Sequence, residues 1–480
     1  MNQKTNSLRP ATRLRPTFFL FLFCAGAVLR LLLCWLNPPG NAFDNHYEPI
    51  LLIMKTGVTP AKNACFQCYH PPVFYWISAA IGTMAVHAGV TLPHVIKLLQ
   101  FVCCFYGIAT LGVCYLILKK FPLSAFSTRI AFGAICFLPR HIYMSAMNSN
   151  DTISYLFVAV SIYLAIVALE CRLAPLRLAV LSIVVTLTVF TKYTAFALIP
   201  AVLAGPLWAY RVRLVVSRKQ LLLSILATLA LPLSILAGYM ATNVKHYHVP
   251  LPWNVSLYDP SAHRPRDPGG ISFVSFKPWE DVGTPMLAPG KLHSFWTMVY
   301  SGMWFDTEPY FLEFLDSNRD WWQHYYAWYR GEEVFPGKNP SFSRLTMLCA
   351  AGLILLGLFP LALVLVGCFI CVSGKWKTLF DATPAQRASL SLFPVLLAFN
   401  VAGIIALALR LPVFNSMKPS YFLNSMPAFM MFIALGVMLW EKNKILRRTV
   451  LLTSGALFTL VTVHVLHIVL CLHALIAQAK

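Results

Sequence analysis

Acidic residues are scarce in this chain, and where they stand is the first clue to its chemistry. The 480 residues hold 17 Asp and Glu, and 58% of the chain is hydrophobic. The stretch "FDNHYEPILLIMKTG" (43–57) leaves an apolar run and at once places Asp44, His46 and Glu48 close together. A further acid, Asp151, opens another apolar run in "MNSNDTISYLF". Because ionisable groups near bilayer depth are costly, Asp44, Glu48 and Asp151 are candidate site residues.

Other roles remain open for each of these residues. Asp44 could be a hydrated loop carboxylate, and Asp151 could cap a helix N-terminus. Asp44 and Glu48 would share a helix face, but Pro49 disfavours helical backbone at Glu48. His46 and His70 lie in the same loop and could support Asp44. A divalent cation on His46, Asp44 and Glu48 is an alternative, although we expect no metal.

The same loop contains two cysteines, Cys65 and Cys68. They form either a short disulfide or two free thiols, because the spacing does not supply the two further ligands that a zinc site needs.

The elements that hold these residues are helices in a membrane. Charged residues make up 11% of the chain, against about 25% in soluble domains. The net charge of +21 then reflects Lys and Arg at cytoplasmic helix ends, and we expect no nucleic-acid partner. The sequence predicts an all-α polytopic protein with about eleven spans. These are 17–36, 93–118, 127–147, 150–170, 174–191, 193–210, 219–241, 345–372, 388–410, 419–440 and 449–473.

One segment, 73–90, decides the orientation of everything after it. If it does not cross and the N-terminus is cytoplasmic, sixteen Lys and Arg after it fall inside, whereas the short outer loops and the outer ends of the spans after it have at most five, as the positive-inside rule requires. We therefore predict an interfacial helix over 73–90, with Phe74, Tyr75 and Trp76 at headgroup level. The predicted parts are a transmembrane catalytic module, 1–241, with a first outer loop, 37–92; an extracytoplasmic loop domain, 242–344; and C-terminal spans, 345–480.

Several stretches together resemble the GT-C glycosyltransferases, the group of the protein O-mannosyltransferases and bacterial aminoarabinose transferases. "FDNHYEPILLIMKTGVTP…CYHPPVFYW" resembles their first outer loop, with its acid and its Pro-Pro-aromatic entry to an interfacial helix. "PRHIYMSAMNSNDTISYLFVAVSIYL", "VFTKYTAFALIP" and "MKPSYFLNSMPAF" resemble later span junctions, in the family's order. One departure is Asn45, where protein O-mannosyltransferases have Glu after the first-loop Asp.

The resemblance implies inverting transfer of a sugar from a polyprenyl-phosphate donor to a lipid, glycan or protein acceptor. The transfer would occur at the extracytoplasmic face of the membrane. In a bacterial inner membrane this is the periplasmic face. Asp44 would be the base, and desolvation that raises its pKa would improve it. Lys192, Lys418 and Arg410, with Arg140 less well placed, would hold the phosphate, and Tyr421 could donate a hydrogen bond to it. Alternatively, these cations extend their side chains to the membrane interface and bind no phosphate. For the whole chain, the alternative function is a transporter or lipid-linked sugar flippase.

Overall fold

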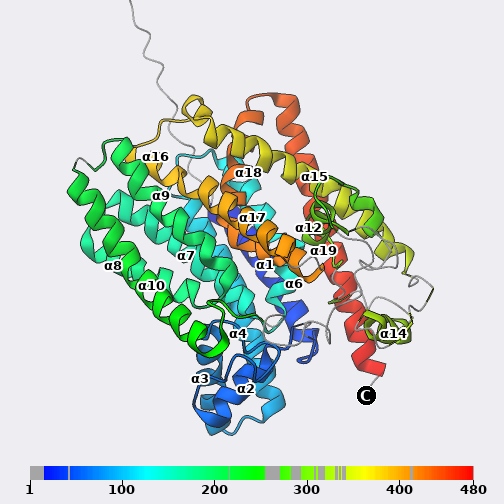
Figure 1. The fold of residues 1–480 in the computed structure, drawn as a ribbon. Coiled ribbons are helices and arrows are strands. Elements are labelled where there is room, and N and C mark those ends of the chain that lie inside the picture. Colours follow the sequence, from blue (N-terminus) through cyan, green and yellow to red (C-terminus); the bar gives the residue numbers. More distant parts are fainter. Residues whose placement is uncertain are drawn as a thin grey trace, which may run out of the picture.

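The chain forms a bundle of helices (Figure 1). The computed structural model describes residues 16–41, 44–215, 217–253, 271–282, 293–307, 310–311, 319–329, 333–334, 337, 342–410 and 414–478. Within these ranges, nine helices are long and apolar enough to cross a membrane, and three shorter apolar helices accompany them. The predicted all-α membrane architecture is confirmed, whereas the count of eleven spans stays a prediction.

The N-terminal half forms long helices broken at the predicted junctions. Its elements are α1 (Pro16–Leu36), α2 (Tyr47–Thr56), α3 (Val73–His87), α4 (Leu92–Leu118), α5 (Ala125–Cys136), α6 (Pro139–Ser145), α7 (Asn150–Glu170), α8 (Pro175–Val189), η1 (Tyr193–Ala197), α9 (Leu198–Arg211) and α10 (Arg218–Tyr247). The predicted span 127–147 is divided into α5 and α6, because Pro139 suits only the first turn of a new helix.

The second half contains short connecting elements followed by long helices. In the loop region these are β1 (Ile271–Ser272), η2 (Pro278–Asp281), β2 (His293–Ser294), α12 (Phe295–Trp304) and α14 (Arg319–Tyr329), and β1 pairs in parallel with β2. The later elements are α15 (Arg344–Val372), η3 (Lys375–Thr378), α16 (Pro384–Leu390), α17 (Leu392–Arg410), η4 (Phe414–Met417), η5 (Pro419–Ser425), α18 (Met426–Trp440) and α19 (Lys444–Gln478).

The two ends of the bundle carry different side chains. At one end, Lys120 Nζ lies 2.7 Å from Glu170 Oε2, and Ser124 Oγ donates to Glu441 over 2.7 Å. At the opposite end lie α2, α3 and the loops around Asp44 (Figure 1). The segments that contain Asp44, Asp151, Lys192 and Lys418 meet at this end, where Lys418 contacts Asp44 and Lys192 contacts Asp151.

Helix α3 is shorter than a typical membrane span. Its 15 residues span about 22 Å at about 1.5 Å per residue, against a hydrocarbon core of about 30 Å. The prediction for its aromatics is only partly right: Trp76 is exposed, but Phe74 and Tyr75 are buried. Both pack in a small core with residues of α2 and α4, including Ile50 and Val95, and do not face the lipid headgroups.

Helix α12 lies inside the bundle, against the middle of a spanning helix. The Tyr300 hydroxyl donates to the Ile354 carbonyl of α15 over 2.5 Å, and the Trp304 indole lies against Gly357 of the same helix. On its other side, Gly302 faces Pro419, the residue after Lys418. The loop region thus contributes a buried helix that supports one of the candidate site lysines.

Candidate active site

Two lysines occupy equivalent positions in different segments. Lys192 lies between α8 and η1, and Lys418 lies between η4 and η5. Each has extended backbone and is the N-cap residue of a 3₁₀ helix that leads into a long apolar helix. Their side chains are 6% and 4% exposed, so both ammonium groups enter the protein interior. The two lysine side chains therefore do not extend to the membrane interface.

Lys418 pairs with the acid of the first loop. Its Nζ lies 2.8 Å from Asp44 Oδ2, and the Asp44 side chain is 31% exposed while that of Lys418 is 4% exposed. A buried ammonium needs such a partner, because desolvation of a lone charge costs several kcal/mol. The pair therefore anchors the start of the first loop to η5.

Lys192 pairs with the second acid. Its Nζ lies 2.6 Å from Asp151 Oδ1, and both side chains are buried. The Ser149 hydroxyl donates to Asp151 Oδ2 over 2.9 Å, and the Asp151 amide donates to that hydroxyl oxygen over 3.2 Å. Ser149 is thus the N-cap residue of α7. The alternative role of Asp151 as a simple cap does not describe its side chain, which is bound to a cation.

Side chains of α7 and η5 connect the two ion pairs. The Tyr155 hydroxyl lies 3.1 Å from Asp151 Oδ1 and 2.8 Å from the Ser420 carbonyl oxygen. Lys192 Nζ lies over the Tyr421 ring, 5.3 Å from its centroid. Asn424 accepts from Ser154 and donates to Thr194, over 3.0 Å each. These contacts hold both lysines and both carboxylates in one site.

The ionisation of Asp44 differs from the sequence expectation. Burial alone would raise the pKa of its carboxyl group, but the attraction of Lys418 and of Lys192 brings that pKa below its ordinary value. The expectation of a raised pKa is therefore wrong for the protein without substrate. Asp44 is a carboxylate at neutral pH and a weak base as long as Lys418 neutralises it.

His46 and His70 stand beside this site as neutral imidazoles. Their ring centroids are 5.6 Å apart, and both side chains are buried. Burial, helped by the charges of Lys192 and Lys418, lowers the pKa of His46 to about 4. The carboxylates of Asp44 and Asp151 act in the opposite direction and do not reverse the shift. Burial also lowers the pKa of His70 well below its ordinary value, and the charges of Lys192, Lys62 and Lys418 act in the same direction.

The remaining candidate residues lie in different surroundings. Glu48 is exposed in the first turn of α2. Arg410 is exposed at the end of α17, and its guanidinium lies 4.8 Å from the centroid of the Trp253 ring. Arg140 is fully buried in α6 over the Tyr310 ring, and its charge acts on Tyr155. The site thus contains the two lysines and Tyr421. Arg140 is buried against Tyr310, Glu48 is exposed to solvent, and Arg410 lies against Trp253.

Three site residues escaped the sequence analysis. Tyr155 lies four residues after Asp151 on one helix face, a spacing that could have identified it. Tyr75 was interpreted as an interfacial aromatic residue, yet its hydroxyl lies 2.9 Å from His46 Nδ1. Lys62 is a buried lysine of the first loop whose Nζ donates to the His70 carbonyl over 2.8 Å. Burial lowers the pKa of Lys62 to about 8.

The acidic groups are poorly arranged for a metal ion. Both carboxylates are occupied by lysine ammonium groups. Over the part of the chain that the structure describes, no group of three or more His, Cys, Asp and Glu side chains could hold a cation. We therefore derive no step through a metal.

Comparison with known proteins identifies the fold. No protein-family model and no curated protein sequence matches the chain. Among solved structures, the Archaeoglobus fulgidus oligosaccharyltransferase in the apo form aligns with a TM-score of 0.53 and 13% identity, over 95% of this chain and 56% of that one. A complex of the same archaeal enzyme, AglB, with an inhibitory peptide and a dolichol-phosphate aligns with a TM-score of 0.50 and 13% identity, over 96% and 56%.

A weaker likeness is to ArnT from Cupriavidus metallidurans in the apo state, with a TM-score of 0.35 and 14% identity, over 88% of this chain and 77% of that one. A further structure of the archaeal oligosaccharyltransferase is a complex with zinc and sulfate, of which this chain covers 53%. The chain thus spans about half the length of the oligosaccharyltransferase structures. At these identities the likeness concerns the fold alone, and this chain has the membrane-helix fold of the archaeal oligosaccharyltransferase.

Proposed function

We propose that this protein is a membrane glycosyltransferase that moves a sugar from a polyprenyl-phosphate donor to an acceptor hydroxyl. The observation that carries this proposal is the pair of buried lysine–carboxylate contacts, Lys418–Asp44 and Lys192–Asp151, at one end of a bundle with the oligosaccharyltransferase fold. A transporter would instead favour charges in the middle of spans and paired broken helices.

The lysines are suited to bind the donor's phosphate. Each is a point charge that can exchange one oxyanion for another, and a phosphate between them would replace the carboxylate partners. When the sugar leaves, the phosphate of the lipid gains a negative charge, and two fixed ammonium groups stabilise that charge. The leaving group needs no proton, so the site requires no general acid.

Phosphate binding would also prepare the base. Once Lys418 turns to the phosphate, Asp44 loses the attraction that keeps its pKa low, while its burial continues to favour the protonated form. Asp44 then accepts the proton of the acceptor hydroxyl as that oxygen attacks the anomeric carbon. Attack opposite the leaving phosphate inverts the configuration. Asp151 stays with Ser149 and Tyr155 and orients the acceptor or the donor sugar.

The proposed site faces the extracytoplasmic side. The sixteen Lys and Arg near helix ends at the opposite end of the bundle support this orientation, with the N-terminus in the cytoplasm. In a bacterial inner membrane the site would open to the periplasm. The acceptor can be a lipid, a glycan or a protein, and the AglB complex with an inhibitory peptide is a reason to include peptides among those tested.

The test is sugar transfer by the purified protein. A panel of radiolabelled polyprenyl-phosphate sugars is incubated with the wild-type protein and with Asp44→Asn in lipid nanodiscs, and released label is counted. We expect release from at least one donor by the wild-type protein and a strong loss in the variant. Protein-driven movement of intact donor across vesicles without release would refute the glycosyltransferase assignment, whereas equal release by both proteins would refute Asp44 as its base.

A further inference from the structure

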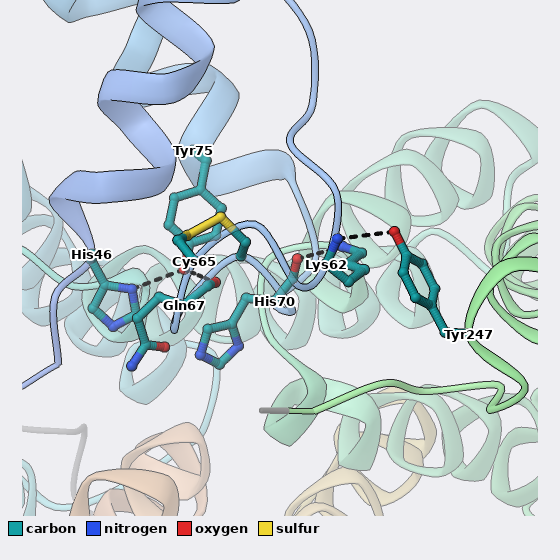
Figure 2. The surroundings of a disulfide bond; sticks show 8 residues. His46, Lys62, Cys65, Gln67, His70, Tyr75 and Tyr247 are labelled. Atoms are coloured by element: carbon teal, nitrogen blue, oxygen red, sulfur yellow. Dashed lines mark hydrogen bonds between the residues drawn. A yellow bond between two sulfur atoms is a disulfide. The ribbon is translucent and has the colours of Figure 1, made fainter. Parts of the chain in front are cut away.

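The disulfide-closed turn of the first loop reaches the site through a single tyrosine. Cys65 and Cys68 form a disulfide, with their Cα atoms 5.1 Å apart, and the Cys68 amide donates to the Cys65 carbonyl over 3.1 Å. Of the two alternatives that the sequence left open, the disulfide is the one present. Gln67 lies inside this turn, and its carbonyl accepts from the Tyr75 hydroxyl over 3.3 Å (Figure 2).

The same tyrosine hydroxyl meets His46. Figure 2 shows the His46 ring on one side of Tyr75 and the Gln67 carbonyl on the other, and the distance from His46 Nδ1 to the Tyr75 oxygen is 2.9 Å. The Tyr75 ring also stacks on the His46 ring at 6.0 Å between centroids. Tyr75, Cys65, Gln67 and Cys68 are all buried, so this arrangement belongs to the interior of the loop.

Proton counting then links the tautomer of His46 to the Gln67 contact. A carbonyl oxygen can only accept, so the 3.3 Å contact with Gln67 is a hydrogen bond only if the single proton of the Tyr75 hydroxyl points to it. The second hydrogen bond can form at the same time only if His46 Nδ1 carries the imidazole proton and donates it to the tyrosine oxygen. A neutral imidazole has one N–H, and its Nε2 is then a bare acceptor.

The ring that carries this acceptor lies near all four charges of the site. The charges of Asp44, Lys192, Asp151 and Lys418 all affect the pKa of His46, and the His46 amide donates to the Asp44 carbonyl over 2.8 Å. His70 is its other neighbour. A bare nitrogen there can accept a hydrogen bond from a hydroxyl, whereas an N–H would direct a proton at the incoming group.

We propose that Tyr75, held by the Cys65–Cys68 turn, is a positioning residue that fixes His46 with Nδ1 protonated and leaves Nε2 to accept a hydrogen bond from a sugar hydroxyl other than the one that attacks, whose proton goes to Asp44. The role given to Nε2 rests on the proposed glycosyl transfer; the tautomer does not. The disulfide contributes by fixing the Gln67 carbonyl, which takes the tyrosine proton and so decides which histidine nitrogen keeps its own.

The test reads the tautomer directly. Protein labelled with ¹⁵N-histidine is reconstituted in nanodiscs, and the His46 resonances are assigned by their absence in His46→Asn. Protonated and bare ring nitrogens have well-separated ¹⁵N shifts. We expect a protonated Nδ1 in the wild-type protein and a mixture of tautomers, or mainly the Nε2-protonated one, in Tyr75→Phe. A wild-type His46 protonated at Nε2 overturns the proposal, and so does an unchanged tautomer in a folded Tyr75→Phe.

Activity provides the second reading. Tyr75→Phe should lower kcat roughly 10–100-fold, the usual cost of losing a partner that orients a histidine, and leave the donor KM nearly unchanged. Cys65→Ser with Cys68→Ser should move both tautomer and kcat in the same direction. The matched control is Tyr247→Phe, which removes the hydroxyl that accepts from the Lys62 amide in the same loop (Figure 2) and should alter neither.

Two failures can be told apart in this design. If the wild-type protein transfers no sugar but shows the expected tautomer and its change in Tyr75→Phe, the proposed function fails and the positioning of His46 stands. If sugar is transferred and Tyr75→Phe has the kcat of the Tyr247→Phe control, the positioning role fails and the proposed function stands.

Discussion

The Lys418 ammonium lies 2.8 Å from the Asp44 carboxylate, although 374 residues separate the two in the chain. This contact joins the first loop to the segment before α18 and so brings the two distant parts of the chain together in the site. It also sets the resting state of Asp44, whose pKa the pair lowers. The consequences of removing either member can therefore be predicted separately for binding and for chemistry.

Asp44→Asn should abolish most of the turnover while the protein stays folded. Asn keeps the shape of the side chain and loses its basicity, so we expect a fall in kcat of roughly 10²–10⁴, the usual contribution of a positioned base. Lys418→Gln should instead raise the donor KM more than it lowers kcat. Turnover of radiolabelled donor measures both. Wild-type kcat in a monodisperse Asp44→Asn preparation would show that the base is another residue.

The buried pair Lys192–Asp151 should show strong coupling in stability. Removing one charge leaves the other buried without its partner, which costs about 3–5 kcal/mol, whereas replacing both by neutral groups is often nearly neutral. We expect Asp151→Asn and Lys192→Met each to lower the melting temperature in detergent, and the double variant to recover most of the loss. All three variants should have much lower sugar-transfer activity than the wild-type protein.

Melting temperature and sugar-transfer activity together test the role of the Lys192–Asp151 pair. A double variant as unstable as the sum of its parts would mean that the two charges do not depend on each other. A stable double variant with wild-type turnover would show that neither side chain takes part in the reaction.

Much of this arrangement could be predicted from span ends and charge alone. Asp44, Asp151, Lys192 and Lys418 were candidates because each stands at the end of an apolar run that the positive-inside rule assigns to one face. Which lysine meets which acid could not be predicted, because the partner depends on how four helices pack. The lowered pKa of Asp44 follows from that pairing and was missed for the same reason.

Tyr75 illustrates a different limit. An aromatic residue at the start of an interfacial helix is typical of the headgroup region, and Trp76 is indeed exposed there. Tyr75 is buried because the helix turns that face toward α2 and the disulfide-closed turn, and its hydroxyl then requires a partner. A sequence gives the periodicity of a helix, but the face that is covered by a neighbouring loop is a tertiary property.

Stability should fall as the pH decreases from neutral. The pKa of folded His46 is about 4, below its ordinary 6.5, so the unfolded chain binds the proton first and the slope reaches about 1.4 kcal/mol per pH unit between these values. His70 and Asp44 have lowered pKa values and act in the same direction, Asp44 at more acidic pH. We expect the melting temperature to fall from pH 6.5 to 4, and less steeply in His46→Asn. Equal slopes in both proteins would contradict the assigned pKa of His46.

Gly302 should be intolerant of even one added carbon. A Cβ there would lie 2.7 Å from Pro419 Cγ and 2.9 Å from Thr307 Oγ1, so Gly302→Ala pushes against the residue that follows Lys418. Overpacking of this kind costs about 1–3 kcal/mol, and we expect a raised donor KM as Lys418 moves. Gly403→Ala is the control, since nothing lies within 4 Å of its added carbon. A normal donor KM in Gly302→Ala would show that α12 does not position Lys418.

The side of the membrane on which the site lies depends on α3 not crossing. Val58 and Thr91 flank α3 and are both exposed, whereas Ser217 is exposed at the start of α10, at the other end of the bundle. Single cysteines at these three positions, in a variant that keeps Cys65 and Cys68 and lacks the other cysteines, are treated with an impermeant maleimide on intact cells. We expect Val58→Cys and Thr91→Cys to react from outside and Ser217→Cys only after permeabilisation. Labelling of Val58→Cys and Thr91→Cys from opposite sides would mean that α3 crosses, which would place Asp44 and Asp151 in different compartments and exclude a shared site. Labelling of only Ser217→Cys from outside would keep the site intact but turn it toward the cytoplasm.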